Sequence, residues 1–144
     1  MIDGRAFLLT GASGSGKSTW ARAAREEGAR VVSDDTVVVD AASGVVELLG
    51  TPVRAHEAHP GGAGRWPVAA LLHARWGTPP GLAPVAPLAF HARLAANLPF
   101  LGSAWGRDAR LETVADVLAQ RVPHRELTFS PDPGFVALLR HTAF

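Results

Sequence analysis

Short apolar runs alternate with segments of helical spacing along the chain, and this alternation predicts an α/β fold. Residues 5–10 (RAFLLT) have the length and composition of a buried strand. Residues 17–27 (KSTWARAAREE) are rich in helix formers, and Gly28 stands where a helix C-cap belongs. Residues 30–33 (RVVS) predict a second short strand, so the chain opens with a strand, a helix and a strand.

Two further apolar runs predict an antiparallel hairpin. They are 36–40 (TVVVD) and 45–49 (VVELL), and a glycine-containing turn at 41–44 (AASG) separates them. Turn formers dominate 50–65, which predicts a long loop. The run 68–76 (VAALLHARW) fits a strand or a helix, and we favour a strand.

The C-terminal half is expected to contain two helices, a strand and a last helix. Four prolines within 78–87 exclude a long helix in that segment. Helical spacing covers 88–98 and 108–121. A strand at 125–130 and a helix at 133–141 follow, and we expect all these elements to form a mixed sheet with flanking helices.

Length and composition exclude several classes of protein. At 144 residues the chain has the length of one domain, which we expect to span 1–144. A net charge of +1 gives no broad basic footprint, so no nucleic-acid partner is expected. No apolar run is long enough for a membrane helix, and residues 1–5 lack the pattern of a signal peptide. Without cysteine the chain forms neither disulfides nor thiolate metal sites, and we expect a cytoplasmic protein.

The chain has a single lysine, Lys17. The other 13 of its 14 basic residues are arginine. A general preference for arginine codons explains the arginines but not the exception. A compact ammonium reaches between β- and γ-phosphates, where a planar guanidinium fits poorly. The position therefore indicates a requirement for lysine.

Lys17 belongs to the pattern G-x-x-x-x-G-K-[ST], which is typical of loops that bind a nucleoside triphosphate. The pattern lies directly between the first predicted strand and helix. In such a loop, backbone N–H groups and the helix N-terminus bind the phosphates, the lysine neutralises them and the hydroxyl ligates Mg²⁺. A plain glycine-rich turn is the alternative. The residues expected to bind the nucleotide are Gly11, Ala12, Ser13, Gly14, Ser15, Gly16, Lys17, Ser18 and Thr19.

A pair of carboxylates follows the second predicted strand. If that strand runs parallel to the first, Asp34 and Asp35 emerge at the sheet edge that also carries the loop. One carboxylate would hold Mg²⁺ together with Ser18, and the other would accept a proton from the attacking hydroxyl. Adjacent residues of an extended chain point to opposite sides, so we expect divided roles, in an order that the sequence leaves open. An Asp-Asp turn before the hairpin is the alternative.

These features together resemble a known family. The segment GASGSGKST, a short helix, and GARVVSDD followed by a hairpin are similar to the catalytic domain of HPr kinase/phosphorylase and its small serine-kinase-like relatives. Residues 50–52 (GTP) and 120–129 (QRVPHRELTF) also resemble the small relatives. The resemblance spans most of the chain and is specific across 7–35. Ser18 is followed by Thr19, where the family commonly has a glutamate.

The resemblance implies a P-loop fold of the kind that HPr kinases share with phosphoenolpyruvate carboxykinases. It also implies a kinase that uses ATP and Mg²⁺ to phosphorylate a serine or another hydroxyl acceptor. In the family the loop lysine and serine and the aspartate pair carry the chemistry. By this match Lys17, Asp34 and Asp35 are catalytic, and Ser18, Asp34 and Asp35 ligate the metal.

Two other functions remain open at this point. A metabolite or polynucleotide kinase also often has an aspartate pair after its second strand, but it usually continues into a helix rather than a hairpin. A nucleotide-sensing binding module would keep the loop without turnover. The sequence leaves open the acceptor, a phosphorylase activity and a homo-oligomer formed around Trp66 and Trp105.

Several residues of the predicted long loop are weaker candidates. His56, Glu57 and His59 offer a metal or substrate contact, but a solvated polar loop is the favoured interpretation because no third fixed ligand is evident. Arg54 and Arg65 are candidates for clamping a γ-phosphate or an acidic substrate.

The tryptophans and one histidine are expected to be structural. Trp20, Trp66, Trp76 and Trp105 are assigned to the core or to an interface, with adenine stacking by Trp66 as an alternative. His73 lies within an apolar run and is expected to be a core histidine with its hydrogen bonds satisfied.

Overall fold

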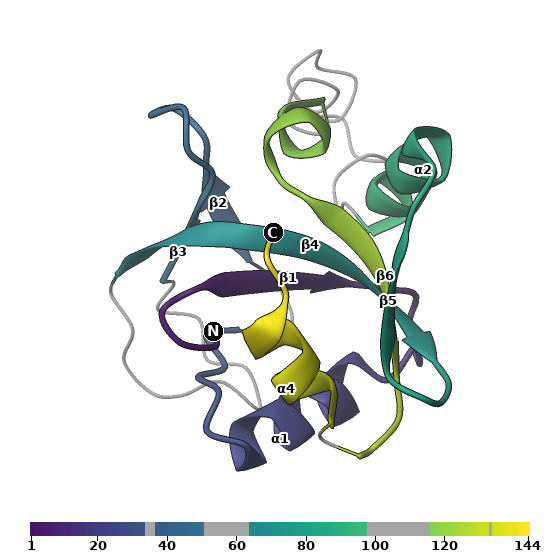
Figure 1. Ribbon diagram of the computed structural model, residues 1–144. Coiled ribbons are helices and arrows are strands. Elements are labelled where there is room, and N and C mark those ends of the chain that lie inside the picture. The colour runs from purple at the N-terminus through teal and green to yellow at the C-terminus, as the bar shows by residue number, and fades with distance from the viewer. Residues whose placement is uncertain (34–36, 51–63, 98–115, 133) are drawn as a thin grey trace.

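The computed structural model describes residues 1–33, 37–50, 64–97, 116–132 and 134–144. These residues form a six-stranded mixed sheet with helices against both faces (Figure 1), so the predicted α/β class is confirmed. The strands are β1 (Ala6–Thr10), β2 (Val38–Asp40), β3 (Glu47–Leu49), β4 (Arg65–Trp76), β5 (Gly81–Pro84) and β6 (His124–Phe129). The helices are α1 (Lys17–Glu26), α2 (Pro87–Asn97) and α4 (Gly134–His141), and residues 116–121 are also helical.

Strand β4 is the centre of the sheet because β1, β3 and β6 all pair with it. β1 runs parallel to β4 and pairs Thr10 with His73. β6 runs parallel to the opposite edge of β4 and pairs Trp76 with Phe129. β5 is antiparallel to β6, and the β2–β3 hairpin joins the start of β4. The parallel strands β1, β4 and β6 therefore point their carboxyl ends toward the same side of the molecule, where the loop after β1 begins.

Helices α1 and α4 cover one face of the sheet with an aromatic and aliphatic core. Phe135 of α4 stacks on Trp20 of α1 at 5.2 Å between ring centroids and meets Phe129 of β6 edge-on at 6.1 Å. Alanines on the buried side of α1 let the helix lie close to the strands. Full burial of one phenylalanine or leucine side chain contributes roughly 1.5–3 kcal/mol, so this layer is a main source of stability.

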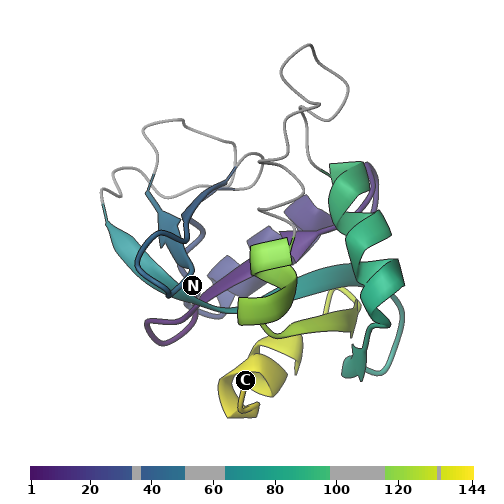
Figure 2. The same cartoon turned by 90° about the horizontal axis from the view of Figure 1, so that it is seen from above.

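Helix α2 and the helical residues 116–121 cover the opposite face, onto which Figure 2 looks. Phe90 and Leu94 of α2 are buried there, as are Leu118 and Val122. Val46 and Leu48 from the hairpin belong to the same cluster. The core is thus divided by the sheet into two layers, one on each face.

Most of the predicted elements are confirmed within the described residues. The hairpin forms with Asp40 opposite Glu47, and the run 68–76 is part of β4, a strand as favoured. The predicted helices at 88–98 and 133–141 correspond to α2 and α4, and the strand at 125–130 to β6. Of the helix predicted at 108–121, residues 116–121 are helical and the rest lies outside the described residues.

One predicted strand does not form, and one strand was not predicted. Residues 30–33 form no strand, because Arg30 exchanges backbone hydrogen bonds with Met1 instead of joining a ladder. The proline-rich segment 78–87 lacks a long helix as predicted, and it also contains strand β5 at the edge of the sheet, which was not predicted. An edge strand tolerates Pro84 because one side of such a strand makes no ladder hydrogen bonds.

Among the helices that the structure describes, none has the length and apolar character that crossing a bilayer requires.

Candidate functional site

The glycine-rich loop, residues 11–16, connects the end of β1 to the start of α1. Gly14 and Gly16 have φ angles of +78° and +89°, in the left-handed region that favours glycine. Gly16 is also the N-cap of α1, and among the described residues no side chain caps the helix. The backbone N–H groups of the first helical turn are therefore left for another acceptor, an arrangement that binds anions.

The ammonium of Lys17 lies across the beginning of this loop. Its Nζ donates hydrogen bonds to the carbonyl oxygens of Gly11 at 2.7 Å and Ala12 at 2.9 Å. Within the loop the N–H of Ser15 donates to the carbonyl of Ala12 at 3.1 Å. The two carbonyls use two of the three ammonium donors. Two backbone carbonyls of the loop thus hold the positive charge of the lysine in place.

The loop is held from both faces of the sheet. A Cβ added at Gly16 would lie 3.0 Å from the ring of Trp76 and 3.1 Å from the ring of Phe129. From the other face, Asn97 of α2 accepts a hydrogen bond from the N–H of Gly11 at 3.3 Å. Glycine at position 16 is therefore required for two reasons, its backbone conformation and the close approach of two aromatic rings.

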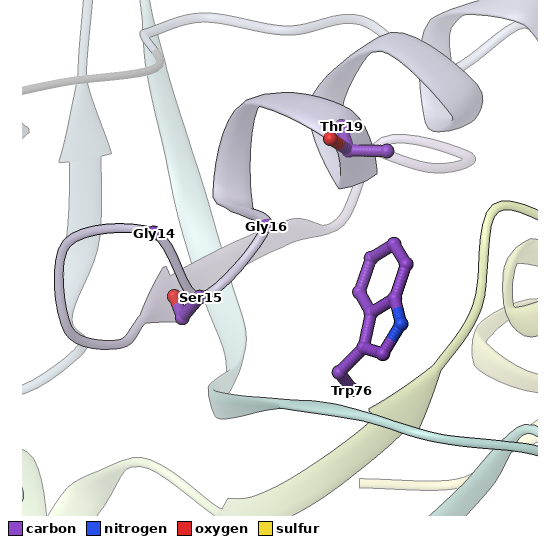
Figure 3. Close-up of a pocket in the computed structure, with 5 residues that line it drawn as sticks. All are labelled: Gly14, Ser15, Gly16, Thr19 and Trp76. Carbon is purple, nitrogen blue, oxygen red and sulfur yellow. The ribbon is translucent and has the colours of Figure 1, made fainter.

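A cavity of about 370 Å³ opens beside the loop. It is lined by Gly14, Ser15, Gly16, Thr19 and Trp76. Figure 3 shows the Trp76 ring rising from the end of β4 toward the first turn of α1, where Thr19 lies. Trp76 is 54% exposed, so of the two places predicted for it, the core and an interface, the core is excluded. The volume is within the range of small-molecule sites, roughly 300–1,000 Å³.

A row of polar residues crosses the other face of the sheet and begins next to the loop. Thr10, His73 and Glu126 are register partners on β1, β4 and β6. Thr10 Oγ1 and His73 Nδ1 share a hydrogen bond of 2.7 Å. Glu126 accepts hydrogen bonds from Arg93 of α2 at 2.8 Å and from Arg75 of β4 at 3.1 Å.

The surroundings of this row determine its protonation. His73 is 3% exposed, and among the described residues its Nε2 has no hydrogen-bond partner. Burial, reinforced by the charges of Arg93 and His124, lowers the pKa of His73 to about 4, although Glu126 acts in the opposite direction. Hydrogen bonds from Arg93 and then Arg75 hold the pKa of Glu126 below its ordinary value. At neutral pH the histidine is therefore neutral and the glutamate charged.

The predicted nucleotide-binding residues that form the loop lie together at the start of α1. Ser18 is exposed on the first turn of α1, and Thr19 reaches the cavity. The aspartates Asp34 and Asp35 lie outside the described residues, as do Arg54, His56, Glu57, His59 and Trp105. Within the part of the chain that the structure describes, no three potential metal-ligating side chains cluster.

Two of the weaker candidates, Arg65 and Trp66, make contacts away from the glycine-rich loop. Arg65 is the first residue of β4, and its guanidinium pairs with the carboxylates of Asp40 and Glu47 in the hairpin. Trp66 is in β4 rather than in a loop, and the guanidinium of Arg30 lies over its ring at 5.1 Å. His73 is buried as expected, but only its Nδ1 has a partner among the described residues.

Sequence reasoning did not identify two residues that contact the loop, Trp76 and Asn97. A signal for Trp76 was present, because it ends an apolar run just before Gly77 and thus stands at the end of a predicted strand. No local signal marks Asn97.

Comparison of the chain with protein-family models, with curated proteins and with solved structures finds no match.

Proposed function

We propose that this protein is an ATP- and Mg²⁺-dependent kinase with a P-loop fold like that of HPr kinases, acting on a serine or another hydroxyl acceptor. The observation that carries the proposal is the position of Lys17, whose ammonium lies across the glycine-rich loop on the carbonyls of Gly11 and Ala12. A strand that ends at such a loop and a helix that starts from it are the parts that hold a polyphosphate.

Three groups support binding of the phosphates. The first turn of α1 begins at Gly16 without a side-chain cap among the described residues, so its N–H groups and helix dipole favour an anion. Lys17 adds a full positive charge at the loop. The left-handed φ angles of Gly14 and Gly16 are of the kind found in anion-binding nests.

The oxygen ligands that this chain offers fit Mg²⁺. Ser18 is exposed at the start of α1, and a hydroxyl together with aspartate carboxylates is a set of hard oxygen ligands. When bound, Mg²⁺ would neutralise charge that develops on the β- and γ-phosphates. We assign this ligand role to Ser18 and to one of Asp34 and Asp35. The other aspartate would accept the proton of the acceptor hydroxyl.

Replacing the lysine tests the proposal most directly. Lys17→Ala should weaken ATP binding by about 2–4 kcal/mol and abolish transfer, because a charge-assisted contact to phosphate is lost. Lys17→Arg should fail as well, since a planar guanidinium does not fit between the phosphates. Arg22→Ala is the matched control, because it removes an exposed charge from the same helix. Wild-type affinity in Lys17→Arg, measured by isothermal titration calorimetry, would contradict the argument.

Chelation of Mg²⁺ separates a loop-built site from a metal-built one. With EDTA present, we expect ATP to bind with reduced affinity while transfer stops, because backbone N–H groups hold phosphate without metal. Calorimetric titrations with and without EDTA measure this. Complete loss of binding in EDTA would mean that the metal, rather than the loop, builds the site.

The two aspartates distinguish a kinase from a nucleotide-sensing module. Asn at the metal-ligating position should raise the Mg²⁺ requirement and be partly rescued by Mn²⁺. Asn at the other position should leave ATP affinity unchanged and lower transfer by roughly 10²–10⁴-fold. A fall much below tenfold for both Asp34→Asn and Asp35→Asn would assign the pair to a structural turn. If wild type binds ATP but transfers to no acceptor, the protein is a binding module.

A further inference from the structure

We propose that Trp76 stacks on the nucleobase of the triphosphate, with the base in the cavity between the end of β4 and the first turn of α1. This inference rests on the proposed function, because it extends the site from the phosphates to the rest of the nucleotide. Trp76 and four residues of the loop and α1 line the same cavity (Figure 3). A ligand held by the loop therefore has an aromatic ring next to it.

The indole is anchored along one edge and open elsewhere. Its Cζ3 and Cε3 atoms approach Gly16, at 3.0 and 3.1 Å from where a Cβ would be. The ring of Phe129 meets it edge-on at 5.1 Å between centroids and at an angle of 79°. With these contacts the residue is still 54% exposed. A large ring fixed in place yet open to solvent is suited to stacking, since little conformational entropy is lost when a flat ligand binds.

The distribution of charge along the loop predicts the orientation of the bound nucleotide. The ammonium of Lys17 lies at the beginning of the loop, on Gly11 and Ala12. The cavity lies at the end of the loop, and its described lining consists of glycine, hydroxyl and indole groups without a charged side chain. The phosphates therefore belong along the loop, from the lysine to the backbone N–H groups at the start of α1, and the base belongs beyond them, at Trp76. Thr19 adds a hydroxyl, which can donate or accept a hydrogen bond, to the lining of this cavity.

Trp66 is unsuitable for the same role. The guanidinium of Arg30 lies over its ring at 5.1 Å, and the residue is partly buried against the core cluster on the α2 face. This makes Trp66→Phe a useful matched control. It removes an indole from the same strand without touching the cavity.

The test compares ATP with inorganic tripolyphosphate, which has the phosphates but no base. In the wild type we expect ATP to bind roughly 5- to 100-fold more tightly than tripolyphosphate, the scale of stacking one base on an aromatic side chain. Trp76→Ala should bring the ratio of the two affinities to about 1, because lost support of the loop would weaken both ligands alike while the lost ring affects ATP alone. Trp76→Phe should keep most of the advantage of ATP, because phenylalanine still offers an aromatic face beside the loop. Trp66→Phe should behave as wild type.

Two outcomes overturn the stacking inference and leave the proposed function intact. One is ATP binding that Trp76→Ala does not weaken. The other is an equal loss of ATP and tripolyphosphate affinity in both Trp76 variants, which would make the indole a support for the loop. If the wild type binds neither ligand, the proposed function fails and the inference fails with it.

Fluorescence gives a second measurement that does not depend on affinity differences. A base stacked on Trp76 should quench tryptophan emission at saturating ATP in the wild type and in Trp66→Phe. Tripolyphosphate should leave the emission unchanged. Loss of the quenching in Trp76→Phe, at ATP concentrations that saturate that variant, identifies Trp76 as the stacked ring. Equal quenching in Trp76→Phe and wild type would contradict the proposal.

Discussion

On the face covered by α1 and α4 the strands contribute aromatic and aliphatic side chains to the core, whereas on the face covered by α2 the same strands also carry a histidine, a glutamate and an arginine. The difference follows from the alternation of side chains along a strand. In β4, Leu72 and Ala74 face α1, while His73 and Arg75 belong to the other side. The glycine-rich loop lies between the two layers. Both layers therefore contain a hydrophobic core cluster, and the layer under α2 also places titratable groups beside the loop.

The largest expected effect on stability concerns the layer between the sheet and helices α1 and α4. Phe135→Ala should lower the free energy of unfolding by about 3–5 kcal/mol, because Phe135 is fully buried and contacts both Trp20 and Phe129. Leu88→Ala, on the exposed side of α2 and 82% exposed, should change it by less than about 0.5 kcal/mol. Urea unfolding measures both. A loss below about 1 kcal/mol for Phe135→Ala would contradict the role of Phe135 in the core under α1 and α4.

In the layer under α2, the buried His73 should make the stability of the protein depend on pH. Its pKa is lowered to about 4 in the folded protein, so between the unfolded value of about 6.5 and about 4 only the unfolded chain binds the proton. The contribution of His73 to the free energy of unfolding is therefore fully present above about pH 6.5 and is lost as the pH falls to about 4. At about 1.4 kcal/mol per unit, the loss reaches roughly 3 kcal/mol.

Urea unfolding of His73→Gln at several pH values isolates this effect. As the pH falls from 7 to 4, the unfolding free energy of the wild type should decrease relative to that of His73→Gln. The control is His141→Gln, which removes an exposed imidazole from α4. Parallel pH profiles for wild type and His73→Gln would show that the buried histidine is not responsible.

A smaller effect is expected where the α2 layer contacts the loop. Asn97→Ala removes the acceptor of the Gly11 N–H and should weaken tripolyphosphate binding about 2- to 10-fold, the scale of one hydrogen bond of 0.5–1.5 kcal/mol. Asn97→Asp keeps an acceptor but adds a negative charge, so it should weaken binding further while changing stability less. Unchanged affinity in both variants would mean that α2 does not position the loop.

The smallest effects belong to the ion pairs of Glu126. Arg93→Gln should raise the pKa of Glu126 more than Arg75→Gln does, because the Arg93 bond is shorter and its side chain less exposed. Since the pKa of Glu126 is lowered by folding, the stability from these pairs is lost as the pH falls through that carboxyl's titration. Each partly exposed pair contributes less than about 1 kcal/mol. NMR titration of the Glu126 carboxyl carbon ranks the two arginines, and a larger shift in Arg75→Gln would reverse the order.

Local patterns predicted the parts of the fold that depend on a few neighbouring residues. The apolar run before Gly11, the helix formers after Gly16 and the turn of the hairpin each act within one element. The same holds for the candidate site, because Gly14, Gly16 and Lys17 are adjacent along the chain. A glycine forced into the left-handed region and a lysine at a helix start need no distant partner to be recognised.

What only the tertiary structure decided is which distant segments meet. Residues 30–33 have the composition of a strand, but the partner of Arg30 is Met1, and no ladder forms. Residues 81–84, within the proline-rich segment 78–87, become β5 because β6 offers them a free edge. Trp76 reaches the loop only because β4 runs parallel to β1, and Asn97 only because α2 packs over that pair. Pairing between strands depends on contacts across tens of residues, and no local pattern in the sequence encodes them.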